Sequence, residues 1–125
     1  MPLARQEALA SGSIIFNQGA PAEKIYLLDH GSVAIKTSFP DGLEITFEII
    51  TRKGDPFGLS ALIAPFRFTT TAICLEKTGV LGFPQKKLMQ AFSLHPALGF
   101  KVMQNLSVLM ARRLERTRHI LAGQV

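Results

Sequence analysis

The 125-residue sequence has no tryptophan, one tyrosine and one cysteine. The single cysteine, Cys74, excludes a disulfide within the chain and any site that needs several cysteine ligands. It falls in a strand-like segment, so we expect a buried, structural thiol. Apolar runs are only a few residues long, which argues against a membrane-spanning helix. The N-terminus lacks a basic-then-apolar signal, and the expected location is therefore cytoplasmic.

Side chains that carry catalytic or metal chemistry are sparse. The three histidines, His30, His95 and His119, lie far apart and show no HxH or HExxH spacing. We therefore expect no metal site. No acid–base pair or nucleophile arrangement stands out, so the sequence does not predict an enzyme.

What the sequence does contain is enough apolar residues for a core. Hydrophobic residues make up 47% and charged residues 18%, which predicts one globular domain over residues 1–125.

The net charge of +5 is concentrated near the end of the chain, where one acid, Glu115, lies among five cations: Lys101, Arg112, Arg113, Arg116 and Arg118. Such a basic stretch can bind nucleic acid; a solvated helix face is the alternative.

Residues 11–84 contain short strand-like runs separated by Gly/Pro turns about every ten residues. The expected strands are 13–16, 24–28, 33–37, 44–49, 72–75 and 78–83. Asp41-Gly42 is a hairpin signal between two of them. The spacing predicts an all-β sandwich or barrel.

The hydrophobic period changes after residue 84, where residues 85–122 are expected to be helical. The sequence predicts a short helix over Gln85–Phe92 and a long one over Ala97–Leu121, with Pro96 opening it. Five apolar residues and one threonine recur every three or four positions in the long helix and form one seam: Met103, Leu106, Met110, Leu114, Thr117 and Leu121. Such a seam favours a homodimer. In the alternative, the helix folds back entirely onto its own barrel.

The stretch Gly54–Ala72 has the outline of an anion site. A glycine, Gly58, precedes a short apolar helix that Pro65 ends, and a cation with three hydroxyls follows. Backbone N–H groups at a helix start attract anions, and arginine and hydroxyls can complete a phosphate cradle. The candidate ligand-binding residues are Gly58, Leu59, Ser60, Ala61, Arg67, Thr69, Thr70 and Thr71. The alternative is a turn, a packing helix and a surface strand.

Three segments in order, Ser11–Pro21, Ile25–Val33 and Gly54–Gly58, resemble the cyclic-nucleotide-binding domain of the catabolite activator protein (Crp/Fnr) superfamily. The resemblance implies an eight-stranded jelly-roll barrel (double-stranded β-helix) with flanking helices and a long C-terminal helix. It also implies a non-enzymatic sensor whose ligand could be cAMP or cGMP and whose helix transmits the signal.

Two positions depart from the family pattern. The family's glutamate, which binds the ribose hydroxyl, corresponds to Leu59, and its arginine, counted back from Leu75-Glu76, corresponds to Phe68. Arg67 lies one residue early, and a one-residue slip in a strand turns a side chain to the opposite face. We therefore expect an altered pocket that takes a small phosphorylated ligand.

Two alternatives remain. The domain could be a ligand-free dimerisation or docking module with a degenerate pocket, or the sensor fragment of a Crp/Fnr-type transcription regulator. The chain ends before a helix-turn-helix could start, so we expect no direct DNA binding by these residues alone.

Overall fold

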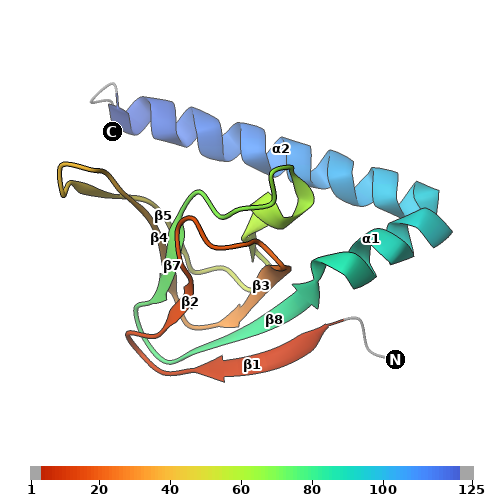
Figure 1. The fold of residues 1–125 in the computed structure, drawn as a ribbon, viewed down its shortest axis with the longest axis horizontal. Helices are drawn as coiled ribbons and strands as arrows, with labels where there is room; N and C mark the ends of the chain where they lie inside the picture. The colour runs from red at the N-terminus through yellow and green to blue at the C-terminus, as the bar shows by residue number, and fades with distance from the viewer. Residues whose placement is uncertain (1–3, 122–125) are drawn as a thin grey trace. The chain divides into compact units, whose positions relative to one another are not determined.

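The structure, a computed structural model, describes residues 4–121, except for the side chain of Ile120. It divides the chain into two compact units, residues 1–88 and 89–125, and each is described by itself. Figure 1 shows the secondary structure. The strands are β1 Arg5–Leu9, β2 Ile14–Phe16, β3 Lys24–His30, β4 Val33–Ser38, β5 Glu44–Ile50, β6 Pro56–Phe57, β7 Thr71–Cys74 and β8 Thr78–Pro84. A 3-10 helix, η1, spans Leu59–Leu62, and the α-helices are α1 Gln85–Leu94 and α2 Pro96–Leu121.

Within the described part of the first unit, the eight strands form two four-stranded antiparallel sheets. One has the order β1-β8-β3-β6 and the other β2-β7-β4-β5. Neighbours in each sheet are therefore often far apart in sequence: β3 lies between β8 and β6, and β4 between β7 and β5. This is the jelly-roll barrel that the resemblance implied, so the predicted fold class is confirmed.

The six strands expected from turns and alternation are all present, within one or two residues of their predicted ends. The expected range for the strands, 11–84, nevertheless starts too late, because β1 precedes it. β1 runs antiparallel to β8, with Arg5 opposite Gly82 and Leu9 opposite Thr78 (Figure 1). Its sequence, Arg-Gln-Glu-Ala-Leu, has no β-branched or aromatic residue, and long-range pairing with β8 overrides this weak local preference.

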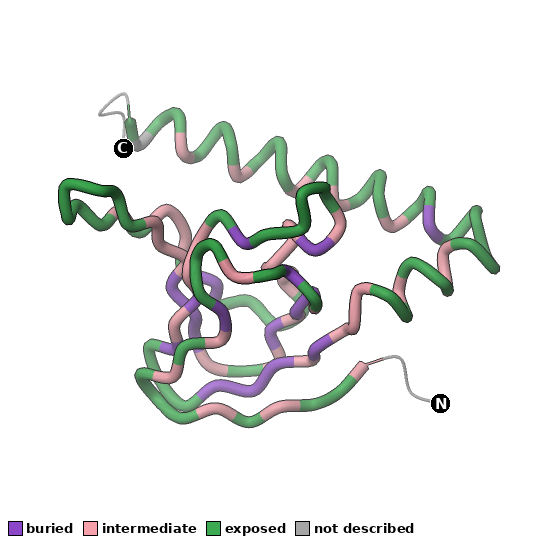
Figure 2. Tube along the Cα trace, viewed as in Figure 1, coloured by how far each residue is buried: buried purple, intermediate pink, exposed green. Residues whose placement is uncertain are grey.

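The core cluster contains buried residues from both sheets. Figure 2 marks the buried positions along the chain in purple. The most deeply buried include Leu28, Val33, Phe57 and Val80. Cys74 is also buried, which confirms the expected structural thiol, and burial raises the pKa of this thiol. A core of this kind supplies most of the favourable free energy of folding.

Buried polar groups join the β3–β4 turn to the β7–β8 turn. The Thr78 hydroxyl lies 3.2 Å from the Ser32 carbonyl oxygen and 2.9 Å from that of Glu76, and it accepts a bond from the Ser32 N–H at 3.3 Å. The Ser32 hydroxyl donates to the Glu76 carboxylate at 2.8 Å. These bonds compensate for the loss of hydration of groups that would otherwise be buried without partners.

The second unit contains the end of α1 and all of α2. Gly99 lies in the first turns of α2, and a Cβ at this position would approach Phe92 of α1 to 3.0 Å. The absent side chain therefore lets the two helices meet closely at their corner. Among the described residues, neither helix has a segment long and apolar enough to cross a membrane.

Candidate functional site

The candidate site begins at a tight turn between β6 and η1. Gly58 adopts φ 75° and ψ 32°, a left-handed conformation that glycine reaches without strain. A Cβ at Gly58 would lie 3.3 Å from the rings of Phe16 and Tyr26 and 3.4 Å from that of Phe68. Glycine is therefore needed both for the backbone angle and for the close approach of three rings. The short helix expected here is η1, in which Ala61 is fully buried.

Four aromatic rings fill the barrel interior beside this turn. Phe16 and Phe68 are stacked, with centroids 3.8 Å apart and planes 12° apart. Phe16 also lies 5.9 Å from Tyr26, and Tyr26 lies 5.5 Å from Phe57. Aromatic pairs at the wider spacing of Phe16–Tyr26 and Tyr26–Phe57 add to the stability that burial alone provides. We call Phe16, Tyr26, Phe57 and Phe68 the aromatic cluster.

Phe68, at the position of the family's arginine, is a core residue, since only 6% of the residue is exposed. Leu59, at the position of the family's glutamate, packs against the same core. Two positions that would hold charged groups in the family pattern are thus apolar packing residues here.

Arg67 contacts the β2–β3 loop rather than the Gly58–Ala61 turn, with which it was expected to form an anion site. Its guanidinium donates to the Gly19 carbonyl oxygen at 3.0 Å, and its backbone forms an isolated antiparallel bridge with Pro21. The side chain is exposed. The structure therefore pairs Arg67 with the β2–β3 loop, and no contact of its guanidinium with Gly58–Ala61 is seen among the described residues.

The three threonines after Arg67 are not equivalent. The Thr71 hydroxyl accepts a hydrogen bond from the Gln18 N–H at 2.9 Å, again tying this segment to the β2–β3 loop. Thr69 is exposed and Thr70 half-buried. Gly58 lies beside the Phe68 ring, and Leu59 and Ala61 pack in the same core as Phe68. Arg67 and Thr71 are instead engaged with the β2–β3 loop.

Sequence reasoning missed Phe16 and Tyr26 as part of the site. Burial, and next the negative charge of Glu7, raise the pKa of the Tyr26 hydroxyl to about 12, so it stays protonated at neutral pH. One signal was available: Phe16 ends a strand directly before the Asn17-Gln18-Gly19 turn. The rings that pack against Phe16, those of Tyr26 and Phe68, could not be identified from the sequence without the fold.

The predicted seam lies along α2, the other element with a proposed role. Met103, Met110 and Leu114 are 41%, 44% and 53% exposed, while Leu106 and Thr117 are half-buried. The Thr117 hydroxyl lies 3.0 Å from the Arg113 carbonyl oxygen one turn earlier, so this polar residue has an internal partner. Among residues 4–121 no group of three metal-binding side chains occurs.

A family model for the cyclic nucleotide-binding domain matches residues 6–95, which is most of the chain. The chain belongs to the cyclic nucleotide-binding domain family. The match spans η1, α1 and every strand except the first residue of β1, and it includes the Gly58 turn and the aromatic cluster.

Within this family the chain is similar to transcriptional regulators of the Crp type. It is 30% identical over 103 residues to the global nitrogen regulator of Synechocystis, covering 81% of this chain and 45% of that protein. It is 27% identical over 114 residues to a CRP-like cAMP-activated global transcriptional regulator of Mycobacterium tuberculosis, covering 91% and 49%. The chain thus spans about half the length of the curated relatives it matches.

Solved structures of the family have the same fold. The Thermus thermophilus catabolite activator protein superposes with a TM-score of 0.79 at 25% identity, covering 96% of this chain and 54% of that one. A putative cyclic nucleotide-binding protein from Geobacter metallireducens gives 0.76 at 25% identity, covering 90% and 80%. The global regulator CLP of Xanthomonas campestris gives 0.85 at 20% identity, covering 96% and 58%, and supports the fold alone.

Proposed function

We propose that this chain is the sensor module of a Crp-type regulator. It binds a small phosphorylated ligand at the Gly58 turn and signals through α2, without catalysis. The observation that carries the proposal is the family match over residues 6–95 on a barrel whose Gly58–η1 turn is intact. The similar proteins are regulators, and one of them is named as cAMP-activated.

Cyclic AMP or cyclic GMP is the ligand class to test first. The candidate ligand-binding stretch Gly58–Thr71 has no acidic residue, and Arg67 is its one cation. A charge-assisted hydrogen bond contributes about 1.5–3 kcal/mol, so the loss of the glutamate at Leu59 weakens ribose recognition about tenfold or more. We therefore propose a weak cyclic-nucleotide site or one that favours another phosphorylated ligand.

We also propose that α2 forms a homodimer through the seam of Met103, Leu106, Met110, Leu114 and Thr117. The 26-residue helix carries exposed apolar side chains on this seam, at Met103, Met110 and Leu114, and an exposed apolar row of this kind favours a partner surface. A second copy, related by a two-fold axis, would bury this row against itself.

The direct test is a thermal-shift screen of the chain against cyclic AMP, cyclic GMP and related phosphorylated nucleotides. A ligand present at about a hundred times its dissociation constant stabilises the folded state by about 2.7 kcal/mol, which gives a shift of several degrees. Arg67→Ala should reduce that shift. An unchanged melting temperature with every ligand, from a folded protein, contradicts the ligand assignment.

A second candidate is a ligand-free dimerisation or docking module. It is favoured by Phe68, whose ring fills the barrel interior where a ligand-binding domain needs space. This candidate predicts that Arg67→Ala changes stability no more than an ordinary surface substitution, within about 0.5 kcal/mol. It also predicts self-association with no response to any nucleotide.

A further inference from the structure

Phe68 reaches the core from a segment that belongs to neither sheet. Residues 66–68 lie between η1 and β7. The Phe66 N–H donates to the Ile63 carbonyl oxygen at 2.8 Å, and three further backbone hydrogen bonds join the segment to the β2–β3 loop. Ala22 donates to the Phe66 carbonyl oxygen at 2.7 Å, Phe68 donates to that of Ala20 at 2.9 Å, and Gly19 donates to that of Phe68 at 2.7 Å. The segment is held by these three hydrogen bonds and the Arg67–Pro21 bridge rather than by a sheet, so once those bonds break it can move without any strand of the two sheets separating.

The residue that starts this segment is strained. Phe66 has φ 59°, the one positive φ of a non-glycine residue among those described, and the residue is 40% exposed. A bulky residue in the left-handed region is disfavoured, and such outliers occur at clamps and switches. The strain lies two residues before the buried ring, where a change of backbone angle would turn the whole segment.

Arg67 and Phe68 point in opposite directions. In an extended stretch, successive side chains alternate between the two faces. Here the Phe68 ring is inside against Phe16, and the Arg67 guanidinium is outside on the Gly19 carbonyl oxygen. A half-turn of the segment that carries one side chain out therefore carries the other in.

We propose that residues 66–68 form a two-state switch at the ligand site. In the closed state seen here, Phe68 occupies the interior beside Gly58, and Arg67 is outside. A ligand that combines a planar ring with an anionic group selects the second state, in which its ring takes the place of Phe68 against Phe16 and Arg67 turns inward to the anion. This proposal rests on the proposed function, because it assumes that the Gly58 site binds a ligand.

The ligand class follows from the space that the Phe68 ring would vacate and from the positive charge that Arg67 would bring into the site. The space that Phe68 leaves is flat and bounded by the Phe16 ring, which suits a planar heteroaromatic ring. Removing a buried apolar ring is unfavourable unless another apolar surface replaces it. A purine nucleotide meets both needs, and a ringless sugar phosphate meets only the charge requirement. Because the competent state is a minor one, the observed affinity is reduced by its population.

The test uses the full chain, with cyclic AMP as the probe and ribose 5-phosphate as the ringless control. Binding is measured by calorimetry for the wild type, Phe68→Leu, Arg67→Ala and Phe83→Leu. The last is a matched control in β8, outside the aromatic cluster. Phenylalanine-labelled protein gives a second readout, the nuclear Overhauser contact between the Phe16 and Phe68 rings. The single tyrosine, Tyr26, lies in the same cluster and provides near-ultraviolet circular dichroism.

We expect cyclic AMP to abolish the Phe16–Phe68 contact and ribose 5-phosphate to leave it intact. Phe68→Leu should bind cyclic AMP about tenfold more tightly, equivalent to about 1.4 kcal/mol, because it weakens the closed state. Arg67→Ala should bind about tenfold more weakly, and Phe83→Leu should match the wild type. If Phe68→Leu does not fold, the ring contact in the wild type and the Arg67→Ala affinity decide the matter.

Binding that leaves the ring contact intact, with Phe68→Leu no tighter than wild type, overturns the switch and leaves the proposed sensor function standing. Absence of binding by every folded variant contradicts the sensor function and the switch together. Binding by Phe68→Leu alone supports the switch and places the wild type almost wholly in the closed state.

Discussion

At the scale of single residues, Gly31 and Gly42 show how surroundings decide the effect of one methyl group. Both have positive φ, 95° and 88°. A Cβ at Gly31 would lie 2.6 Å from the Lys77 carbonyl oxygen and 2.7 Å from the Thr78 Cα, whereas a Cβ at Gly42 meets nothing within 4 Å. A substitution at Gly42 therefore tests backbone strain alone, whereas one at Gly31 adds steric overlap with backbone atoms.

We expect Gly42→Ala to destabilise the protein by about 1–2 kcal/mol, the cost of left-handed backbone for an L-residue. Gly31→Ala should cost about 1–3 kcal/mol more, since backbone atoms must move. Urea unfolding of both variants measures the difference. Equal losses would show that the β3–β4 turn relaxes freely despite the bonds between Ser32 and Thr78.

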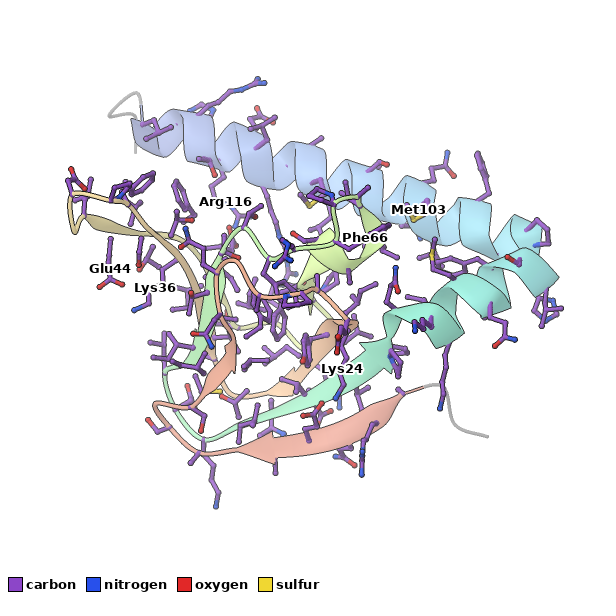
Figure 3. All side chains as sticks on the ribbon, in the orientation of Figure 1. Lys24, Lys36, Glu44, Phe66, Met103 and Arg116 are labelled. Atoms are coloured by element: carbon purple, nitrogen blue, oxygen red, sulfur yellow. The ribbon has the colours of Figure 1, made fainter. Side chains whose placement is uncertain are left out.

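Two carboxylates determine part of the response to acid. The His30 ring, and next Lys53, lower the pKa of Asp29 below its ordinary value. Lys36 at 3.0 Å, and next the Ser38 hydroxyl, lower the pKa of Glu44 (Figure 3). A carboxyl with a lowered folded-state pKa contributes stability above its unfolded pKa and loses it as the pH falls through the folded pKa.

We therefore expect the urea midpoint to fall as the pH drops below the ordinary carboxyl range of about 4. The double variant Asp29→Asn, Glu44→Gln should show a shallower fall. Both carboxylates interact with cations at the surface, where Asp29 and Lys36 are half-buried and Glu44 and His30 are exposed. Solvent screens these interactions, so the effect is small and should shrink further in 1 M salt. A variant whose midpoint falls as steeply as the wild type would assign acid sensitivity to other groups.

At the scale of secondary-structure elements, α2 has two exposed apolar positions that separate the seam from the rest of the helix. Leu114 lies on the seam and is 53% exposed; Val108 is 49% exposed and lies about 120° around the helix from it. If the seam is the dimer interface, a charge at Leu114 is buried without a partner, whereas one at Val108 stays in water.

We expect Leu114→Glu to raise the dissociation constant of the dimer at least tenfold. Val108→Glu should change this constant little. Light scattering after size exclusion, over a range of concentrations, measures both. Equal behaviour of the two variants would show that the copies associate through another surface or not at all.

The elements also show which parts of the fold could be predicted from the sequence. Strands β2 to β5 are bounded by Gly and Pro turns or alternate in polarity, and α2 begins at its proline, so local signals were sufficient. β1 was not predicted, because its stability comes from pairing with β8 rather than from its own residues. The hydrophobic pattern of a five-residue polar strand cannot reveal such a partner.

The site was less predictable than the fold. The Gly58 turn was expected because its chemistry is local, whereas the aromatic cluster joins residues from β2, β3, β6 and the segment before β7. Counting residues placed Phe68 rather than Arg67 at the family's arginine position, and the structure shows why the shift matters: the two side chains point to opposite sides. Whether a ligand reverses the directions of Arg67 and Phe68 depends on the free-energy difference between the closed and the ligand-bound states. A sequence pattern does not reveal that difference.

At the scale of the whole molecule, stability is expected to be uneven between the two units. The barrel amides belong to two sheets around a shared core, while most side chains of α2 are exposed. Local opening requires less free energy where few apolar contacts are lost. Charge is uneven too, since α2 carries five of the cations and one acid.

We expect peptides covering β3 and β8 to exchange amide hydrogens most slowly and those covering the second half of α2 most rapidly. Hydrogen-exchange mass spectrometry at two protein concentrations measures this. Slower exchange in α2 at the higher concentration would support the proposed dimer. Exchange in α2 as slow as in β8 at every concentration would contradict a loosely held helix.

The pairing of β1 with β8 has a consequence for synthesis on the ribosome. The first strand of the chain has its hydrogen-bonding partner between Thr78 and Gly82, so it emerges long before that partner exists. Until then Arg5–Leu9 has no neighbour, and β3 lacks the central strand that lies between it and β1. Closure of the barrel is thus a late, long-range event, and a nascent chain stalled before residue 78 would expose the unpaired edge of β3 to chaperones and to other copies.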